Sequence, residues 1–180
     1  MRGEGETVFP ALASLYIEGT GSFQTIAGIT YRNDHGELQI NEDGAPANMD
    51  ELPFVYDHLE DFSHKIIYYE SSRGCPFRCA YCLSSLEKKL RFRSLDLVKK
   101  ELGFFLQAKV PQVKFLDRTF NCNPRRTVDL WQWILDHDNG ITNFHFEIAA
   151  DLITEEELAI MEQMRPGLIQ LEIGVQSTNM

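Results

Sequence analysis

The segment Arg73–Cys82, which reads RGCPFRCAYC, contains three cysteines in a Cys-x3-Cys-x2-Cys pattern. Three thiolates on one short loop can bind three corners of a cubane iron–sulfur cluster. The fourth iron then lacks a protein ligand and can bind a small molecule, whereas an electron-transfer ferredoxin supplies a fourth cysteine. We therefore expect Cys75, Cys79 and Cys82 to be ligands of a [4Fe-4S] cluster.

Zinc binding and disulfide bonding are the alternative interpretations of these cysteines. A structural zinc site takes four ligands, and the only further cysteine is Cys122, while the nearest histidine is His64, ahead of the loop. The start Met1–Glu4 carries no apolar signal segment, so we expect neither export nor disulfides. For Cys122, unlike the three cysteines of the loop, a buried and inert side chain is a reasonable interpretation. A non-catalytic iron–sulfur or zinc-binding module remains the alternative function.

Sequence on both sides of the cysteines predicts alternating strands and helices. Short β-branched and aromatic runs predict four strands, and Ser94, Asn123-Pro124 and Thr154 are typical helix starts. The order βαβαβαβ predicts an α/β fold with a parallel sheet and right-handed crossovers. The four predicted strands are residues 65–70, 112–117, 143–148 and 168–175.

Polar residues follow each of these predicted strands. The cysteine loop comes after the first strand, Asp117 and Thr119 end the second, Glu147 lies near the end of the third, and Gln176 follows the fourth. Chemistry in parallel α/β folds takes place at the carboxyl ends of the strands. We therefore expect these side chains to surround one site.

The cysteine pattern and its place after the first strand resemble the radical S-adenosylmethionine (SAM) superfamily. In that superfamily the open iron chelates the amino and carboxylate groups of SAM, and one electron from the cluster cleaves SAM. The resemblance implies a partial (βα) barrel with four parallel strands, preceded by a small α+β remnant. It also implies more βα units than this chain provides, so we expect a piece of a longer protein.

A second resemblance concerns the start of the chain. Gly3–Glu6 followed by a helix over Phe9–Glu18 resembles the end of the cobalamin-binding domain that precedes many radical SAM domains. Residues 115–121 and 172–177 resemble strands of the same cobalamin-type subfamily, which includes methyltransferases and the magnesium-protoporphyrin IX monomethyl ester oxidative cyclase. The cobalamin-ligating Asp-x-His-x-x-Gly motif is absent from this sequence. The resemblance therefore implies cobalamin in the full-length protein only, with a tetrapyrrole as one candidate substrate.

The resemblance also implies roles for individual residues. Tyr81 would contact the SAM adenine or shield the cluster from water. Asp117 and Thr119 would approach the SAM amino group, although a strand-end turn explains both equally well. Glu147 and Gln176 would contact the SAM ribose, and the alternative for Glu147 is a surface charge.

The expected organisation has three parts, namely residues 1–20 as the cobalamin-domain remnant, 21–64 as a hairpin and linker, and 65–180 as the barrel. A net charge of −10 argues against a nucleic-acid partner, and no apolar run is long enough to span a membrane. A solvated helix face explains most of the clustering of basic residues at 88–93 and 125–126. We expect a cytoplasmic enzyme with a small-molecule substrate, a reductant such as flavodoxin or ferredoxin, and self-association through the exposed sheet edge.

Overall fold

The computed structural model describes residues 1–56, 58–62, 65–86, 89–175 and 177. The chain divides into two compact units, residues 1–53 and residues 54–180. No helix in the described part of the chain combines the length and the apolar character that a membrane span requires.

The first unit packs one helix against a two-stranded hairpin. Helix α1 spans Gly5–Glu18, and strands β1 (Thr30–Arg32) and β2 (Leu38–Ile40) pair antiparallel. The helix begins four residues earlier than the apolar pattern indicated, because Val8 belongs to the core of this unit and is only 3% exposed.

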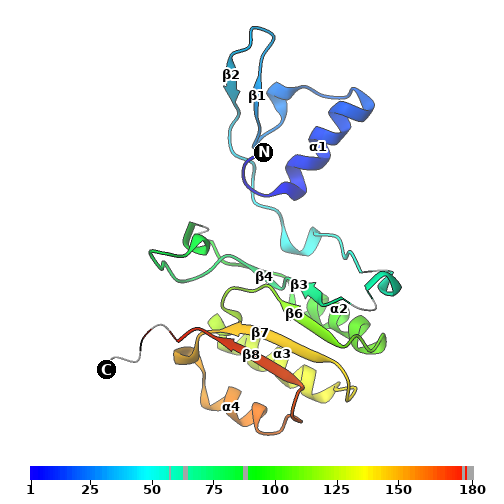
Figure 1. Cartoon of the computed structure of the whole chain (residues 1–180), viewed down its shortest axis with the longest axis vertical. Helices are drawn as coiled ribbons and strands as arrows, with labels where there is room; N and C mark the ends of the chain where they lie inside the picture. Colours follow the sequence, from blue (N-terminus) through cyan, green and yellow to red (C-terminus); the bar gives the residue numbers. More distant parts are fainter. Residues whose placement is uncertain (57, 63–64, 87–88, 176, 178–180) are drawn as a thin grey trace. The chain divides into compact units, whose positions relative to one another are not determined.

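The second unit contains the parallel sheet that the sequence predicted. Its strand order is β3-β6-β7-β8, and every neighbouring pair in it is parallel (Figure 1). This arrangement confirms the α/β fold class. The strands are β3 (Ile67–Tyr69), β6 (Gln112–Phe115), β7 (Asn143–Ile148) and β8 (Ile169–Ile173), and the helices are α2 (Leu95–Gln107), α3 (Pro124–Asp136) and α4 (Glu155–Met161).

One face of this sheet carries the hydrophobic core. Val113, Phe144 and Phe146 alternate with polar residues along their strands, and all three are fully buried. They share one cluster with Leu102 of α2 and Trp131 of α3, so these helices cover that face (Figure 1). Alternation with a period of two therefore gives the sheet one apolar side.

The opposite face of the sheet carries polar and charged side chains. The Lys114 Nζ lies 2.9 Å from a carboxylate oxygen of Glu172, and the His145 Nε2 lies 3.2 Å from the same oxygen. The Glu172 carboxylate raises the pKa of Lys114 by accepting its hydrogen bond, and Lys114 in turn lowers the pKa of Glu172. This face differs from the usual barrel interior, which bulky branched side chains fill.

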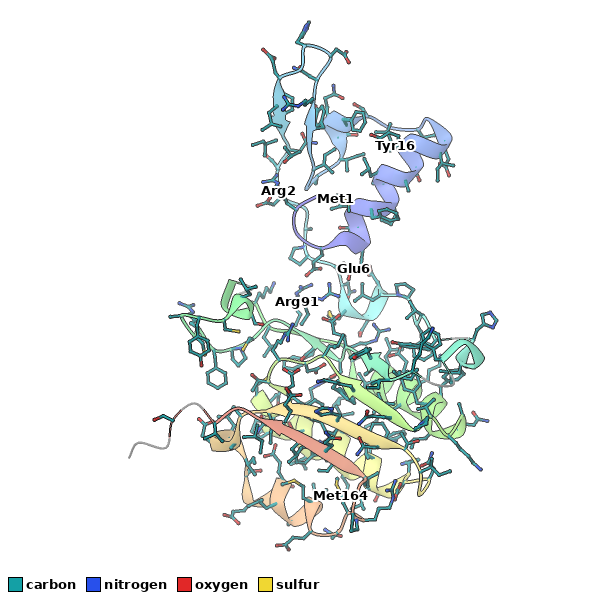
Figure 2. The ribbon with its side chains drawn as sticks, viewed as in Figure 1. Met1, Arg2, Glu6, Tyr16, Arg91 and Met164 are labelled. Atoms are coloured by element: carbon teal, nitrogen blue, oxygen red, sulfur yellow. The ribbon has the colours of Figure 1, made fainter. Side chains whose placement is uncertain are left out.

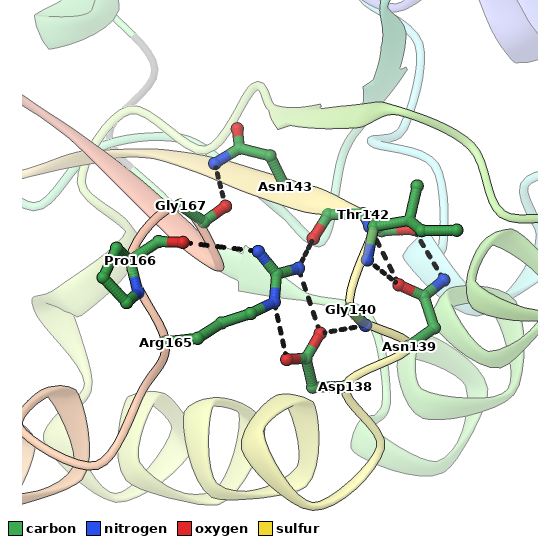
Figure 3. A network of polar contacts seen from close by, with 9 residues as sticks. Asp138, Asn139, Gly140, Thr142, Asn143, Arg165, Pro166 and Gly167 are labelled. Atoms are coloured by element: carbon green, nitrogen blue, oxygen red, sulfur yellow. Dashed lines mark hydrogen bonds and ion pairs between the residues drawn. The ribbon is translucent and has the colours of Figure 1, made fainter.

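Polar contacts join the loops at the amino ends of the strands (Figure 3). The Arg165 Nε donates to Asp138 at 2.7 Å, and its Nη2 donates to the Thr142 carbonyl at 3.0 Å. The Asn143 amide donates to the Gly167 carbonyl at 2.9 Å. These contacts fix the two connections on the side of the sheet away from the cysteine loop.

Several short elements complete the fold, and the sequence patterns did not indicate them. Strands β4 (Ser72–Arg73) and β5 (Arg91–Phe92) form a small antiparallel hairpin, with Arg91 labelled in Figure 2. Two residues per strand are too few to show any periodicity. The 3-10 turns are η1 (Phe23–Thr25), η2 (Met49–Glu51), η3 (Leu59–Phe62), η4 (Leu83–Leu86), η5 (Phe120–Cys122) and η6 (Ala150–Leu152).

Candidate cluster and cofactor site

The cysteine loop leaves the carboxyl end of β3 and is closed at its base by the β4–β5 hairpin. Gly74, at the start of the loop, has a φ of +99°. A Cβ at this position would lie 2.7 Å from the Lys89 carbonyl oxygen and 3.2 Å from the Leu90 Cα. The base of the loop therefore requires glycine for its backbone conformation and for its close packing.

All four cysteines are present as thiols. Cys79 and Cys82 are exposed and Cys75 is half-buried, while the Cys82 N–H donates to the Cys79 carbonyl at 3.1 Å. Among the described residues, no three Cys, His, Asp or Glu side chains converge closely enough to hold a metal ion. Three accessible soft ligands on one loop nevertheless have the donor chemistry that an iron–sulfur cluster needs. Binding requires the loop to draw its thiols together.

Asp117 lies just beyond β6 and is 2% exposed. Its carboxylate accepts from the Ser71 N–H at 2.8 Å, the Ser71 hydroxyl at 2.6 Å and the Ser72 hydroxyl at 2.7 Å, and the backbone of Ser72 adds a further hydrogen bond. Burial raises the pKa of Asp117, and these hydrogen bonds act in the opposite direction. The carboxylate therefore faces the chain ahead of the cysteine loop.

Thr119 contacts a cysteine ligand from outside the cysteine loop. Its Oγ1 lies 3.6 Å from the Cys75 Sγ and donates to the Arg118 carbonyl at 2.8 Å. Cys122 lies at the end of η5, where burial, reinforced by the charge of Asp117, raises the pKa of its thiol to about 11. Cys122 therefore has the character of an inert thiol at neutral pH.

The other predicted contacts are more dispersed. Glu147 lies near the end of β7, with its carboxylate 4.0 Å from the Arg118 guanidinium. Tyr81 is 76% exposed on the cysteine loop. Gln176 lies outside the described residues. The roles of these residues toward SAM remain predictions.

A hollow of about 500 Å³ lies beside the cysteine loop at the carboxyl ends of β3 and β6. The residues that line it include Arg73, Gly74, Leu116 and Arg118. Glu70 also lines it and accepts two hydrogen bonds from Arg73, at 2.9 and 2.6 Å. The hollow thus has apolar and charged lining residues and lies next to the thiols of the cysteine loop. This combination suits the binding of a polar small molecule beside a cluster.

Sequence reasoning missed several residues that shape this site. The basic residues were expected on a solvated helix face, but Arg93 and Arg126 are 5% and 9% exposed, so that expectation was wrong for both. Asn121, also fully buried, donates to the Ala149 carbonyl at 2.8 Å and accepts from its N–H at 2.9 Å. Arg93 pairs with Glu101, eight residues later, and Asn121 pairs with Ala149, 28 residues later, and no local sequence pattern marks either partner.

Residues 69–180 match the family model of the radical SAM superfamily. An uncharacterised methyltransferase of Pyrococcus horikoshii is 34% identical over 141 residues, which are 72% of this chain and 30% of that protein. The chain thus spans less than a third of the length of this relative.

Two solved structures share the fold. The cobalamin-dependent SAM radical enzyme OxsB, with aqua-cobalamin and SAM bound, has a TM-score of 0.75 at 23% identity over 97% of this chain and 27% of OxsB. The radical SAM methyltransferase TsrM of Kitasatospora setae, with tryptophan and a SAM analogue bound, has a TM-score of 0.72 at 17% identity over 97% of this chain and 36% of TsrM.

Proposed function

The chain belongs to the radical SAM superfamily, and on that premise we propose that it is the cluster-bearing part of a cobalamin-type radical SAM methyltransferase. The observation that carries the proposal is the position of three thiols on one loop, after the first strand of a parallel sheet and beside a hollow. A [4Fe-4S] cluster bound there would supply the electron for reductive cleavage of SAM.

The residues of this chain bind and position the reacting groups. Cys75, Cys79 and Cys82 supply three thiolates, and Gly74 lets the backbone turn sharply into the loop. Thr119 lies against the Cys75 sulfur. Its hydroxyl donates to the Arg118 carbonyl here, and would turn its proton to the sulfur to donate to a ligand thiolate. The hollow beside the loop provides space for the nucleoside part of SAM.

Methyl transfer is proposed for the full-length protein because a curated relative is named a methyltransferase. TsrM, whose fold this chain shares, is also described as a methyltransferase. Cyclisation of a tetrapyrrole, the other reaction expected from the sequence, is less well supported, since neither OxsB nor TsrM nor the Pyrococcus protein is described as such a cyclase.

Cobalamin is proposed as a second cofactor of the full-length protein. OxsB is described as cobalamin-dependent, and its likeness to this chain extends over the first unit as well as the sheet. The ligating-histidine motif is absent from the present sequence. The chain itself would therefore not bind cobalamin, and its partners would be a small-molecule substrate and an electron donor such as flavodoxin or ferredoxin.

Anaerobic reconstitution with iron and sulfide tests the proposal. The chain should acquire about four irons and four sulfides. It should also release 5′-deoxyadenosine when SAM and dithionite are added. Replacement of Cys75, Cys79 or Cys82 with alanine should abolish both properties, whereas Cys122→Ala should retain them. Stoichiometric zinc binding that depends on Cys122 would instead support the non-catalytic metal module and overturn the proposal.

A further inference from the structure

Asp117 is a buried carboxylate whose hydrogen bonds all point toward one short segment. The segment Ser71–Ser72 lies three to four residues ahead of Cys75, and it supplies a backbone N–H and two hydroxyls to the two Asp117 oxygens. Both oxygens are engaged and the residue is 2% exposed. The side chain therefore offers no open surface to a bound molecule.

The same segment is held from two other elements. The Ser71 carbonyl accepts from the Arg93 N–H at 2.9 Å and from the Arg126 Nη2 at 3.3 Å. The Arg126 guanidinium lies over the Phe92 ring of β5, 5.1 Å from its centroid. Strands β5 and β6 and helix α3 thus converge on Ser71, at the point where the chain turns toward the cysteines.

An ion pair fixes the hairpin on the side of β5. The Arg93 guanidinium, just after β5, lies 2.6 Å from the Glu101 carboxylate of α2, and both side chains are buried. The base of the cysteine loop is thus fixed where the chain enters it, by Asp117, and where the chain leaves it, by Glu101. Buried polar contacts on both sides of the loop restrict the conformations open to its base.

We propose that Asp117 is a positioning residue, which fixes the base of the cysteine loop so that its thiols can converge on a cluster. This inference rests on the proposed function and assigns Asp117 a task other than direct contact with the SAM amino group. The carboxylate acts through Ser71 and Ser72, and these residues set the direction in which Gly74 and Cys75 leave the sheet.

The hydrogen-bond geometry explains why a carboxylate is needed. One Asp117 oxygen accepts the Ser71 N–H and the other accepts both hydroxyls. An asparagine has only one acceptor oxygen. Its NH₂ group therefore faces either the Ser71 N–H, which can only donate, or the two hydroxyls, which must then turn to accept and lose their own acceptor in a buried site. Asp117→Asn therefore disturbs the hydrogen bonds from Ser71 and Ser72 while it keeps the size of the side chain.

A chelator competition on the reconstituted protein tests this assignment. Loss of an outer-shell contact commonly weakens metal binding about 10- to 100-fold, so Asp117→Asn should lose iron to the chelator at least about tenfold more readily than wild type. Ser72→Ala, which removes a single hydroxyl and is a milder change, should shift retention in the same direction by less. In the metal-free chain, Asp117→Asn should also speed alkylation of the half-buried Cys75, measured by peptide mass spectrometry.

Glu157→Gln provides the matched control. Glu157 is also a fully buried carboxylate of this unit, and it accepts from the Thr154 N–H at 2.8 Å in the α4 capping box, away from the hairpin. When Glu157→Gln and Asp117→Asn lose equal thermal stability, Glu157→Gln should still leave iron retention and Cys75 alkylation unchanged from wild type. Equal iron loss in both variants would reduce the effect to general instability and overturn the assignment.

Other outcomes separate this inference from the proposed function. If Asp117→Asn retains iron and alkylates like wild type, the positioning role is wrong and the proposed function stands. If Asp117→Asn keeps its iron but loses SAM affinity, Asp117 contacts SAM and the positioning role is again wrong. If wild type takes up no cluster, the proposed function fails, while the alkylation of Cys75 in the metal-free chain still decides the positioning role.

Discussion

Replacing Gly74 with alanine should open the base of the cysteine loop. A left-handed backbone costs an ordinary residue about 1–2 kcal/mol, and forcing a methyl group into a filled space typically adds about 1–3 kcal/mol. The added Cβ would meet backbone atoms of Lys89 and Leu90 at 2.7 and 3.2 Å, and backbone atoms cannot rotate away as a side chain can. The expected penalty on the closed hairpin is therefore about 2–5 kcal/mol.

The assay is alkylation of Cys75 in the metal-free chain, together with iron uptake. Because the hairpin has only two residues in each strand, strain is relieved by local opening, and Cys75 should react roughly thirtyfold faster or more for a penalty of about 2 kcal/mol. Gly140→Ala is the control, since Gly140 has a φ of +75° and no atom within 4 Å of an added Cβ. If Gly74→Ala alkylates like Gly140→Ala and binds iron like wild type, close packing does not shape the loop.

Cys122, Thr154 and Asp138 can each be tested by a direct measurement. Cys122, whose pKa burial raises to about 11, should be about a thousandth ionised at pH 8 and should alkylate far more slowly than the exposed thiols of the cysteine loop, as peptide mass spectrometry can show. Thr154→Ala, which removes the α4 cap, should lower stability to denaturant by about 1 kcal/mol without changing iron uptake. Burial acts to raise the pKa of Asp138, but the Arg165 guanidinium and a backbone N–H hold it below its ordinary value. The stabilisation by Asp138 is therefore complete above its unfolded pKa and is lost as the pH falls through its folded pKa, so the difference in Tm between wild type and Asp138→Asn should shrink in acid.

Local patterns were sufficient to predict the parallel sheet. The predicted strand at residues 143–148 has the same bounds as β7, and the predicted helix start at Asn123-Pro124 is the observed start of α3, where Asn123 accepts from the Arg126 N–H. These elements depend on near neighbours, on alternation and on end caps, all of which are visible in a short window of sequence.

The base of the site could not be predicted in the same way. The two-residue strand at Ser72–Arg73 pairs with residues 91–92 across the whole cysteine loop, so nothing nearby in sequence indicates the hairpin. Burial of Arg93 depends on Glu101, which lies on the next helix, and a basic residue in sequence gives no sign of such a partner. Asp117 was found by its place at a strand end, but its hydrogen-bond partners 45 and 46 residues earlier became visible only in the fold.

The polar face of the sheet has a consequence for hydration. A sheet surface built from branched apolar side chains aggregates unless another element covers it. Lys114, His145 and Glu172 instead present groups whose hydrogen bonds water can complete. This surface can therefore face bulk solvent. A molecule that binds to it would displace ordered water and contact charged side chains in its place. The affinity of such a molecule for this face then depends on how well it replaces the hydrogen bonds of the displaced water, more than on how much apolar area it buries.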